Sequence, residues 1–195
     1  HLVGEVVRRV SGKSIGKYFN DEIAVPLNLD FWIGLPEDKF NRVTDINPDK
    51  PALLQKILMP ILSKLPRSLA PDPLKMLLDF TDPTTPAGAA FNNPKMSMQT
   101  GEMEANTTKW RKAEIPAANG HGTARSIAKL YGALAIGGSR DGVHVLSPET
   151  IEMARQTESD GKDLVLGRLH TRFGLGFMLG TEDVSMGPNK DAMGH

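Results

Sequence analysis

Proline limits how this chain can fold between Pro48 and Pro94. Seven further prolines interrupt this stretch, which is rich in leucine and methionine. Because proline lacks a backbone N–H and breaks the interior of an α-helix, no long helix can run through it. We expect residues 48–94 to form a helical lid or insert made of short pieces, with an apolar stripe that packs mainly into the core.

Apolar residues at helical spacing predict further helices outside this stretch. Their starts are marked by capping residues, because a Ser or Thr side chain can accept a hydrogen bond from the first free backbone N–H groups. The predicted helices cover residues 2–10, residues 15–27 after Ser14, residues 124–136 after Thr123, and residues 148–156 after Ser147.

Short strands and one long loop complete the predicted elements. Residues 31–35 and 42–46 are partly β-branched and bounded by proline, and residues 172–179 alternate with period two, so we expect three strands. Residues 87–112 lack periodicity and are expected to form a loop. Trp110 would anchor this loop on the core or form the wall of a pocket.

Composition excludes several classes of function. The 23 basic side chains balance 23 acidic ones, which argues against a nucleic-acid or membrane-surface protein, since both partners reward a cationic excess. The chain has no cysteine, which excludes disulfides, thiolate metal sites and a cysteine nucleophile. No apolar run approaches the roughly 20 residues that span a bilayer, so we expect no membrane span.

The chain lacks the sequence signatures of several large enzyme classes. It contains no Gly-rich phosphate loop followed by lysine, no His-Glu-x-x-His helix and no Gly-x-Ser-x-Gly turn. The five histidines are scattered without metal-ligand spacing. We therefore expect neither a metal site nor a cofactor.

Two Ser-x-x-Lys pairs are candidates for nucleophilic chemistry, Ser14–Lys17 and Ser126–Lys129. On a helix this spacing places the hydroxyl and the amine on one face, where a lysine of lowered pKa could accept the serine proton. The alternative is coincidence, because serine and lysine are common enough to produce such pairs by chance. Tyr18 and Asn20 form a Tyr-x-Asn pattern nearby, but on one helix Tyr18 diverges from Lys17 by about 100°.

The segment around His121 is a candidate binding loop. Asn119, Gly120 and Gly122 flank this histidine just before the helix that Thr123 begins. Backbone donors and a titratable ring could meet a ligand there, so we predict that Asn119 and His121 bind substrate. The alternative is a helix-entry turn with a surface histidine.

The order of segments resembles serine hydrolases of the β-lactamase/penicillin-binding-protein superfamily, specifically class C β-lactamase-like esterases. The matching segments are GEVVRRVSGKSIGKYFNDEIAVPLNL, ANGHGTARSIAKLYGALAIGG, LSPETIEMA and RFGLGF, in the family's order. The resemblance implies an α+β fold, mainly helical in this chain, with a β-lactamase/transpeptidase-like helical domain and part of an antiparallel-sheet domain. Residues 1–195 would be part of one such unit, and residues 171–195 would return as a strand into the sheet domain.

The resemblance also implies how the catalytic residues are distributed. The family's nucleophilic Ser-x-x-Lys and its tyrosine motif would precede residue 1, so that this chain would be an internal fragment that is inactive alone. Gly194–His195 looks like the start of the family's His-x-Gly motif, which makes His195 the predicted catalytic residue of this chain. The resemblance also implies that Ser14 and Ser126 lie in helices that have a structural and not a catalytic role.

The expected activity is that of a serine hydrolase acting through an acyl-enzyme on a small-molecule ester or amide. An apolar lid over residues 48–94 would favour apolar acyl groups, and net neutrality gives no cationic steering for the carboxylate of penicillins or D-alanyl peptides. A carboxylesterase for small apolar esters is therefore expected. The alternatives are a β-lactamase, a D-alanyl-D-alanine peptidase, or a scaffold protein that kept the fold and lost the chemistry.

Overall fold

The computed structural model describes residues 2–47, 61–62, 70–91, 104–164, 166 and 169–194. The chain divides into two units, one made of His1–Asn47 and Met98–Ile151 and the other of Pro48–Ser97 and Glu152–His195. Both units combine helices with antiparallel strand pairs, as an α+β chain should.

The first unit begins with the two predicted helices. α1 (Leu2–Ser11) ends at Gly12, whose φ of +72° is a conformation that glycine adopts without strain. Ser14 then caps α2 (Ile15–Phe19), because its hydroxyl accepts a hydrogen bond from the N–H of Lys17. A π-helical turn over Asn20–Ala24 continues α2 and buries Ala24.

Two strands far apart in the sequence pair in the first unit. β1 (Phe31–Ile33) is antiparallel to β2 (Gly120–Gly122), with Trp32 opposite His121. The parts of the first unit that lie between β1 and β2 in the sequence form a 3₁₀ helix (Glu37–Arg42), a 3₁₀ turn (Glu104–Asn106) and α6 (Thr108–Lys112), which Thr107 caps.

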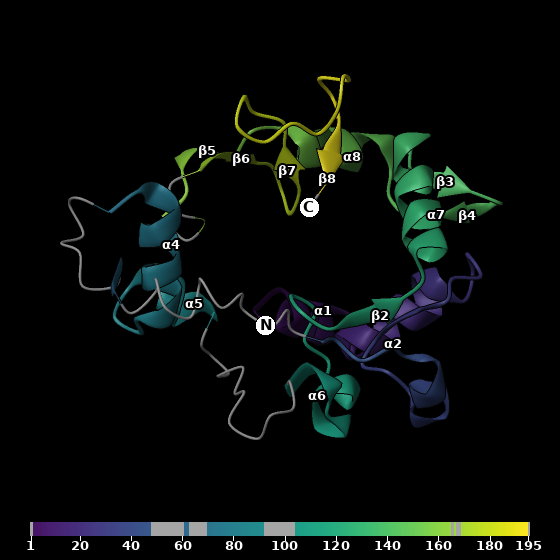
Figure 1. The fold of residues 1–195 in the computed structure, drawn as a ribbon. Coiled ribbons are helices and arrows are strands. Elements are labelled where there is room, and N and C mark those ends of the chain that lie inside the picture. Colours follow the sequence, from purple (N-terminus) through teal and green to yellow (C-terminus); the bar gives the residue numbers. More distant parts are fainter. Residues whose placement is uncertain are drawn as a thin grey trace. The chain divides into compact units, whose positions relative to one another are not determined.

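After β2 the first unit continues with α7 (Ala124–Ala135), capped by Thr123 as predicted. A tight hairpin of β3 (Ser139–Arg140) and β4 (Val143–His144) follows α7 along the chain (Figure 1). Its turn is Asp141–Gly142, both at positive φ, the backbone that a two-residue hairpin turn requires. α8 (Pro148–Arg155) then starts at the predicted Ser-Pro-Glu signal.

The second unit contains a helix pair and a four-stranded sheet. α4 (Asp72–Thr81) contacts α5 (Pro86–Phe91), with Leu74 and Ala87 buried. The antiparallel sheet has the order β5 (Ser159–Lys162), β6 (His170–Phe173), β7 (Met178–Leu179) and β8 (Met193–Gly194), and Figure 1 shows β7 beside β8.

Three predictions about secondary structure were wrong. Residues 42–46 are not a strand, because Pro36 starts a 3₁₀ helix that reaches Arg42, and the Ile46 N–H bonds the Asn106 side chain instead of a neighbouring strand. Residues 172–179 form parts of two strands, since Gly176 at φ +81° turns the chain between β6 and β7. The predicted loop over residues 87–112 contains α5, a 3₁₀ turn and α6 within its described part.

The predicted lid over residues 48–94 is described only in part. Residues 70–91 contain the short helices α4 and α5, with Pro83 between them and Pro86 as the first residue of α5. Residues 48–60, 63–69 and 92–94 lie outside the described residues. The apolar stripe predicted around residues 53–65 therefore falls almost entirely outside them. Whether this segment covers a substrate stays a prediction.

One helix of the first unit leaves its apolar side chains in solvent. Leu2, Val3 and Val10 of α1 are 86%, 76% and 83% exposed.

In the part of the chain that the structure describes, no helix combines the length and hydropathy that crossing a bilayer requires.

Candidate functional site

The pairing of β1 with β2 sorts side chains onto two faces. Successive side chains of a strand point to opposite faces, so Phe31 faces the glycines of β2 while Trp32 and His121 share the other face. A Cβ on Gly120 would lie 2.6 Å from the Phe31 ring, which shows how closely the ring covers the backbone. Phe31 therefore packs on the two glycines of the Gly-His-Gly sequence, and the His121 side chain lies on the other face of the strand pair, with Trp32.

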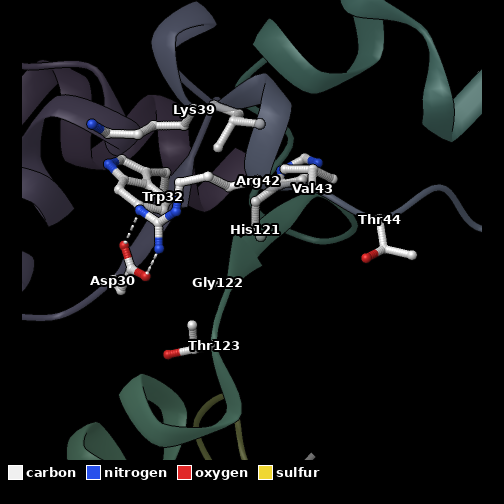
Figure 2. A pocket seen from close by; sticks show the side chains of 11 residues that line it. Asp30, Trp32, Lys39, Arg42, Val43, Thr44, His121, Gly122 and Thr123 are labelled. Atoms are coloured by element: carbon white, nitrogen blue, oxygen red, sulfur yellow. Dashed lines mark hydrogen bonds and ion pairs between the residues drawn. The ribbon is translucent and has the colours of Figure 1, made fainter.

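The face that carries Trp32 and His121 lines a pocket of about 350 Å³. Leu35 and Val43 add apolar surface, and Figure 2 shows the side chains that surround the cavity. All of these residues belong to the first unit. The polar side chains in the lining come from Asp30, Lys39, Arg42, Thr44, His121 and Thr123.

Arg42 joins the 3₁₀ helix to the start of β1. Its guanidinium forms a two-pronged ion pair with Asp30, in which Nη1 lies 2.9 Å from Oδ1 and Nη2 contacts Oδ2. The same guanidinium lies 5.8 Å from the centre of the Trp32 ring, within cation–π range. Figure 2 shows Arg42 between Trp32 and Asp30.

These contacts set the charges at this end of the pocket. The hydrogen-bonded Arg42 guanidinium lowers the pKa of Asp30, and the charge of Lys39 acts in the same direction. The pair with Asp30 raises the pKa of Arg42 in turn. Both groups are therefore ionised across the neutral range.

His121 lies in strand β2, so the prediction that it occupies a loop was wrong, but it does line the pocket. Burial lowers the pKa of its imidazole and the positive charge of Arg111 adds to this, while the backbone of Asn119 opposes the shift. Nδ1 is buried and has no partner at hydrogen-bond geometry among the described residues. Neutral imidazole is therefore the favoured form at pH 7.

Asn119 is 2% exposed and is bonded entirely to backbone. Its Nδ2 donates to the carbonyls of Trp110, at 2.9 Å, and Ala113, and its Oδ1 accepts from the N–H of Ile115 at 2.9 Å. These bonds hold the segment from α6 to β2 in one conformation. The Asn119 side chain thus binds the segment that leads into β2. The prediction that it contacts substrate remains a prediction.

His195, the predicted catalytic residue, lies outside the described residues. The preceding residues, Met193 and Gly194, form β8, which pairs with Leu179 and Met178 of β7. Residues 171–194 contain most of β6 together with β7 and β8, three strands of one antiparallel sheet where one strand was expected. That they return into the family's sheet domain stays a prediction.

Ser14 is held in a structural network. Its hydroxyl donates to Glu114 Oε1 at 2.8 Å and accepts from the N–H of Lys17 at 3.3 Å. The Lys17 ammonium lies 2.9 Å from Asp21 Oδ2. The first Ser-x-x-Lys pair therefore serves as a helix cap and an ion pair.

Ser126 is also held structurally. It is 5% exposed, and its hydroxyl accepts from the Asp30 N–H at 2.8 Å and lies 3.0 Å from the hydroxyl of Thr123. Lys129 pairs instead with Asp141, at 2.8 Å. This serine ties the start of α7 to the residue that precedes β1.

The sequence did not predict the part of the lining that comes from residues 30–44, which includes Asp30, Trp32 and Arg42. The strand at residues 31–33 was expected, but its partner strand was not, so nothing indicated that Trp32 would face His121. Trp110, by contrast, is 8% exposed in α6, as the anchoring alternative predicted. In the described ranges no three His, Asp or Glu side chains gather closely enough to hold a metal ion.

Comparison with known proteins assigns the family. Residues 1–195 match the Beta-lactamase family. The chain is 30% identical over 152 residues to Esterase/beta-lactamase LipL of Mycobacterium tuberculosis (strain ATCC 25618 / H37Rv), covering 77% of this chain and 31% of LipL. The chain thus spans about a third of that relative.

Solved structures share the fold along the whole chain. A penicillin-binding protein homologue from Caulobacter crescentus and a family VIII carboxylesterase each match with a TM-score of 0.72 and 33% identity, over 100% of this chain and 44% of theirs. EstA from Arthrobacter nitroguajacolicus Rue61a matches in fold, with a TM-score of 0.70 at 22% identity, over 100% of this chain and 45% of EstA. This chain therefore belongs to the beta-lactamase family and has the β-lactamase/transpeptidase-like fold.

Proposed function

We propose that the protein is a serine hydrolase that acts through an acyl-enzyme, with small apolar esters as its preferred substrates. The observation that carries this proposal is the family match over residues 1–195, together with relatives named as an esterase/β-lactamase and a carboxylesterase. The serine oxygen would attack the ester carbonyl and release the alcohol, and water would then release the acid and regenerate the serine.

The nucleophile of this reaction is neither Ser14 nor Ser126. Each hydroxyl is engaged in capping or tying local structure, and each neighbouring lysine is bound to a carboxylate. The ammonium groups of Lys17 and Lys129 lie 2.9 Å from Asp21 and 2.8 Å from Asp141, so neither is held at its serine to accept a proton. The catalytic pair of the proposed reaction therefore lies among other residues of the full-length protein.

The residues of this chain would support catalysis by binding and positioning. His121, neutral and facing the pocket, can exchange hydrogen bonds with a bound ester, and Asn119 holds the segment that carries it. His195 would belong to the family's third motif. Leucine and methionine in residues 48–94 favour apolar acyl groups over charged ones.

A β-lactamase activity is the second candidate, favoured by the name of LipL and by the penicillin-binding protein homologue.

Covalent labelling with a fluorophosphonate or a penicillin tests for the acyl-enzyme that both activities require. We expect the full-length protein to gain the mass of one fluorophosphonate adduct, and the Ser14→Ala and Ser126→Ala variants to label equally. Absence of an adduct with both a fluorophosphonate and a penicillin would contradict the proposal and favour a scaffold protein without catalysis.

A further inference from the structure

The pocket beside β1 and β2 combines apolar walls with an excess of positive charge. Trp32, Leu35 and Val43 supply the apolar surface, and Leu35 is only 2% exposed. Lys39 and Arg42 bring two cations into the lining, whereas Asp30 brings the one carboxylate. Because His121 is neutral at pH 7, the lining carries one net positive charge.

The ion pairs decide which cation is available to a ligand. Two guanidinium nitrogens of Arg42 bind the Asp30 carboxylate, and the guanidinium lies over the Trp32 ring. These contacts hold the Arg42 side chain in place. Lys39 forms an ion pair with its neighbour Asp38, whose side chain is 68% exposed. An exposed pair of this kind contributes little stability, so the Lys39 ammonium can turn to a ligand at small cost.

Hydrogen-bonding groups complete the polar side of the lining. Thr44, Thr123 and His121 also belong to the lining, as does Lys39. A carboxylate accepts hydrogen bonds from hydroxyl, imidazole and ammonium donors alike. One negative charge would neutralise the lining, whereas a dianion would leave an uncompensated charge against Trp32, Leu35 and Val43.

We propose that this pocket binds a small monocarboxylate with a short apolar tail, the carboxylate toward Lys39 and the tail against Trp32 and Val43. The cavity of about 350 Å³ lies at the lower end of the size range of ligand pockets, which suits a molecule of this size. Ester hydrolysis releases acids of this class, but the binding argument stands on the pocket alone. Binding can therefore be measured without turnover.

Trp32 offers a local reporter for a titration of the full-length protein. The indole N–H signal of Trp32, assigned with a Trp32→Phe variant, is followed by NMR as butyrate is added. We expect a saturable shift of this signal while that of the buried Trp110 stays in place. Butyramide, which has the same shape without the charge, should bind about tenfold more weakly, since one charge-assisted hydrogen bond is lost.

Variants locate the carboxylate. Lys39→Gln should weaken butyrate binding about tenfold, Lys39→Arg should largely restore it, and Lys162→Gln, an exposed lysine of β5 in the second unit, should change nothing. The proposal is overturned if the Trp32 signal does not move, if butyramide binds as tightly as butyrate, or if Lys39→Gln binds normally. Equal affinity for inorganic phosphate would also overturn it, because the apolar walls would then play no part.

Discussion

The ring of Phe31 lies against the backbone of Gly122, in the space that any larger residue's Cβ would occupy. A Cβ at this position would come within 2.8 Å of both Phe31 Cγ and the carbonyl oxygen of Asp30. Phe31 cannot simply withdraw, because its ring packs edge-on against Phe19 at 5.5 Å between centroids. The close approach of β1 and β2, and with it the position of His121, depends on this glycine.

Gly122→Ala should therefore lower the free energy of unfolding by about 1–3 kcal/mol, the usual cost of overpacking a filled site. Chemical denaturation measures this value. Gly161→Ala is the matched control, because Gly161 also lies in a strand but has nothing within 4 Å of its added Cβ. Equal stability of the two variants would show that Phe31 does not constrain β2.

Asn119→Ala should destabilise the protein by about 2–3 kcal/mol, because it removes three hydrogen bonds, to the carbonyls of Trp110 and Ala113 and from the N–H of Ile115. Asn189→Ala is the comparison, since Asn189 is exposed and accepts one bond, from the Asp191 N–H. We expect its effect to stay below about 1 kcal/mol. Similar effects of the two substitutions, measured by thermal unfolding, would contradict the role assigned to Asn119.

Glu114 and Ser14 should be energetically coupled. Glu114 accepts from the Ser14 hydroxyl and, through Oε2, from the Gly16 N–H, both at 2.8 Å. Glu114→Gln can satisfy only one of these donors, so we expect a loss of about 1 kcal/mol. In a double-mutant cycle with Ser14→Ala the losses should not add, whereas strict additivity would mean that the bond contributes nothing.

Acid should weaken the start of the first unit. Lys17 and then Lys13 lower the pKa of Asp21 from 3.8 to about 2 by hydrogen bonding to its carboxylate. A carboxyl group whose pKa is lowered on folding stabilises the folded state above its unfolded pKa, and this contribution disappears as the pH falls toward its folded pKa. The contribution of Asp21 should thus be complete above pH 4 and be lost toward pH 2.

Unfolding followed at several acidic pH values checks this expectation. Asp21→Asn should reduce the dependence of the unfolding free energy on pH between these limits. Glu182→Gln, which replaces an exposed carboxylate without an ion-pair partner among the described residues, should leave the dependence as it is. The same slope in both variants would rule out the stabilising role of Lys17 and Lys13.

The helices could be predicted because their signals are local. Ser14, Thr123 and Ser147 each accept a bond from a backbone N–H three residues later, so sequence neighbours alone mark the helix starts. The strands are two to four residues long and pair with distant segments, so no local pattern identifies β2 or its register with β1.

The candidate site could be predicted only in its single histidine. His121 was found because glycines and a helix cap surround it, which is a local pattern. Arg42 pairs with Asp30 and stacks on Trp32 because it ends the 3₁₀ helix that follows Pro36. The sequence did not predict this helix, since the β-branched pattern of residues 42–46 predicted a strand. Family resemblance, carried by four segments in order, indicated the fold where the strand patterns could not.

The most direct test of the proposed function compares two substrates of the full-length protein under the same conditions. One is p-nitrophenyl butyrate, a small apolar ester, and the other is nitrocefin, a β-lactam that carries a carboxylate. We predict a higher kcat/KM for p-nitrophenyl butyrate, because apolar acyl groups suit the leucine- and methionine-rich segment over residues 48–94. Faster turnover of nitrocefin would contradict the esterase assignment and make the protein a β-lactamase.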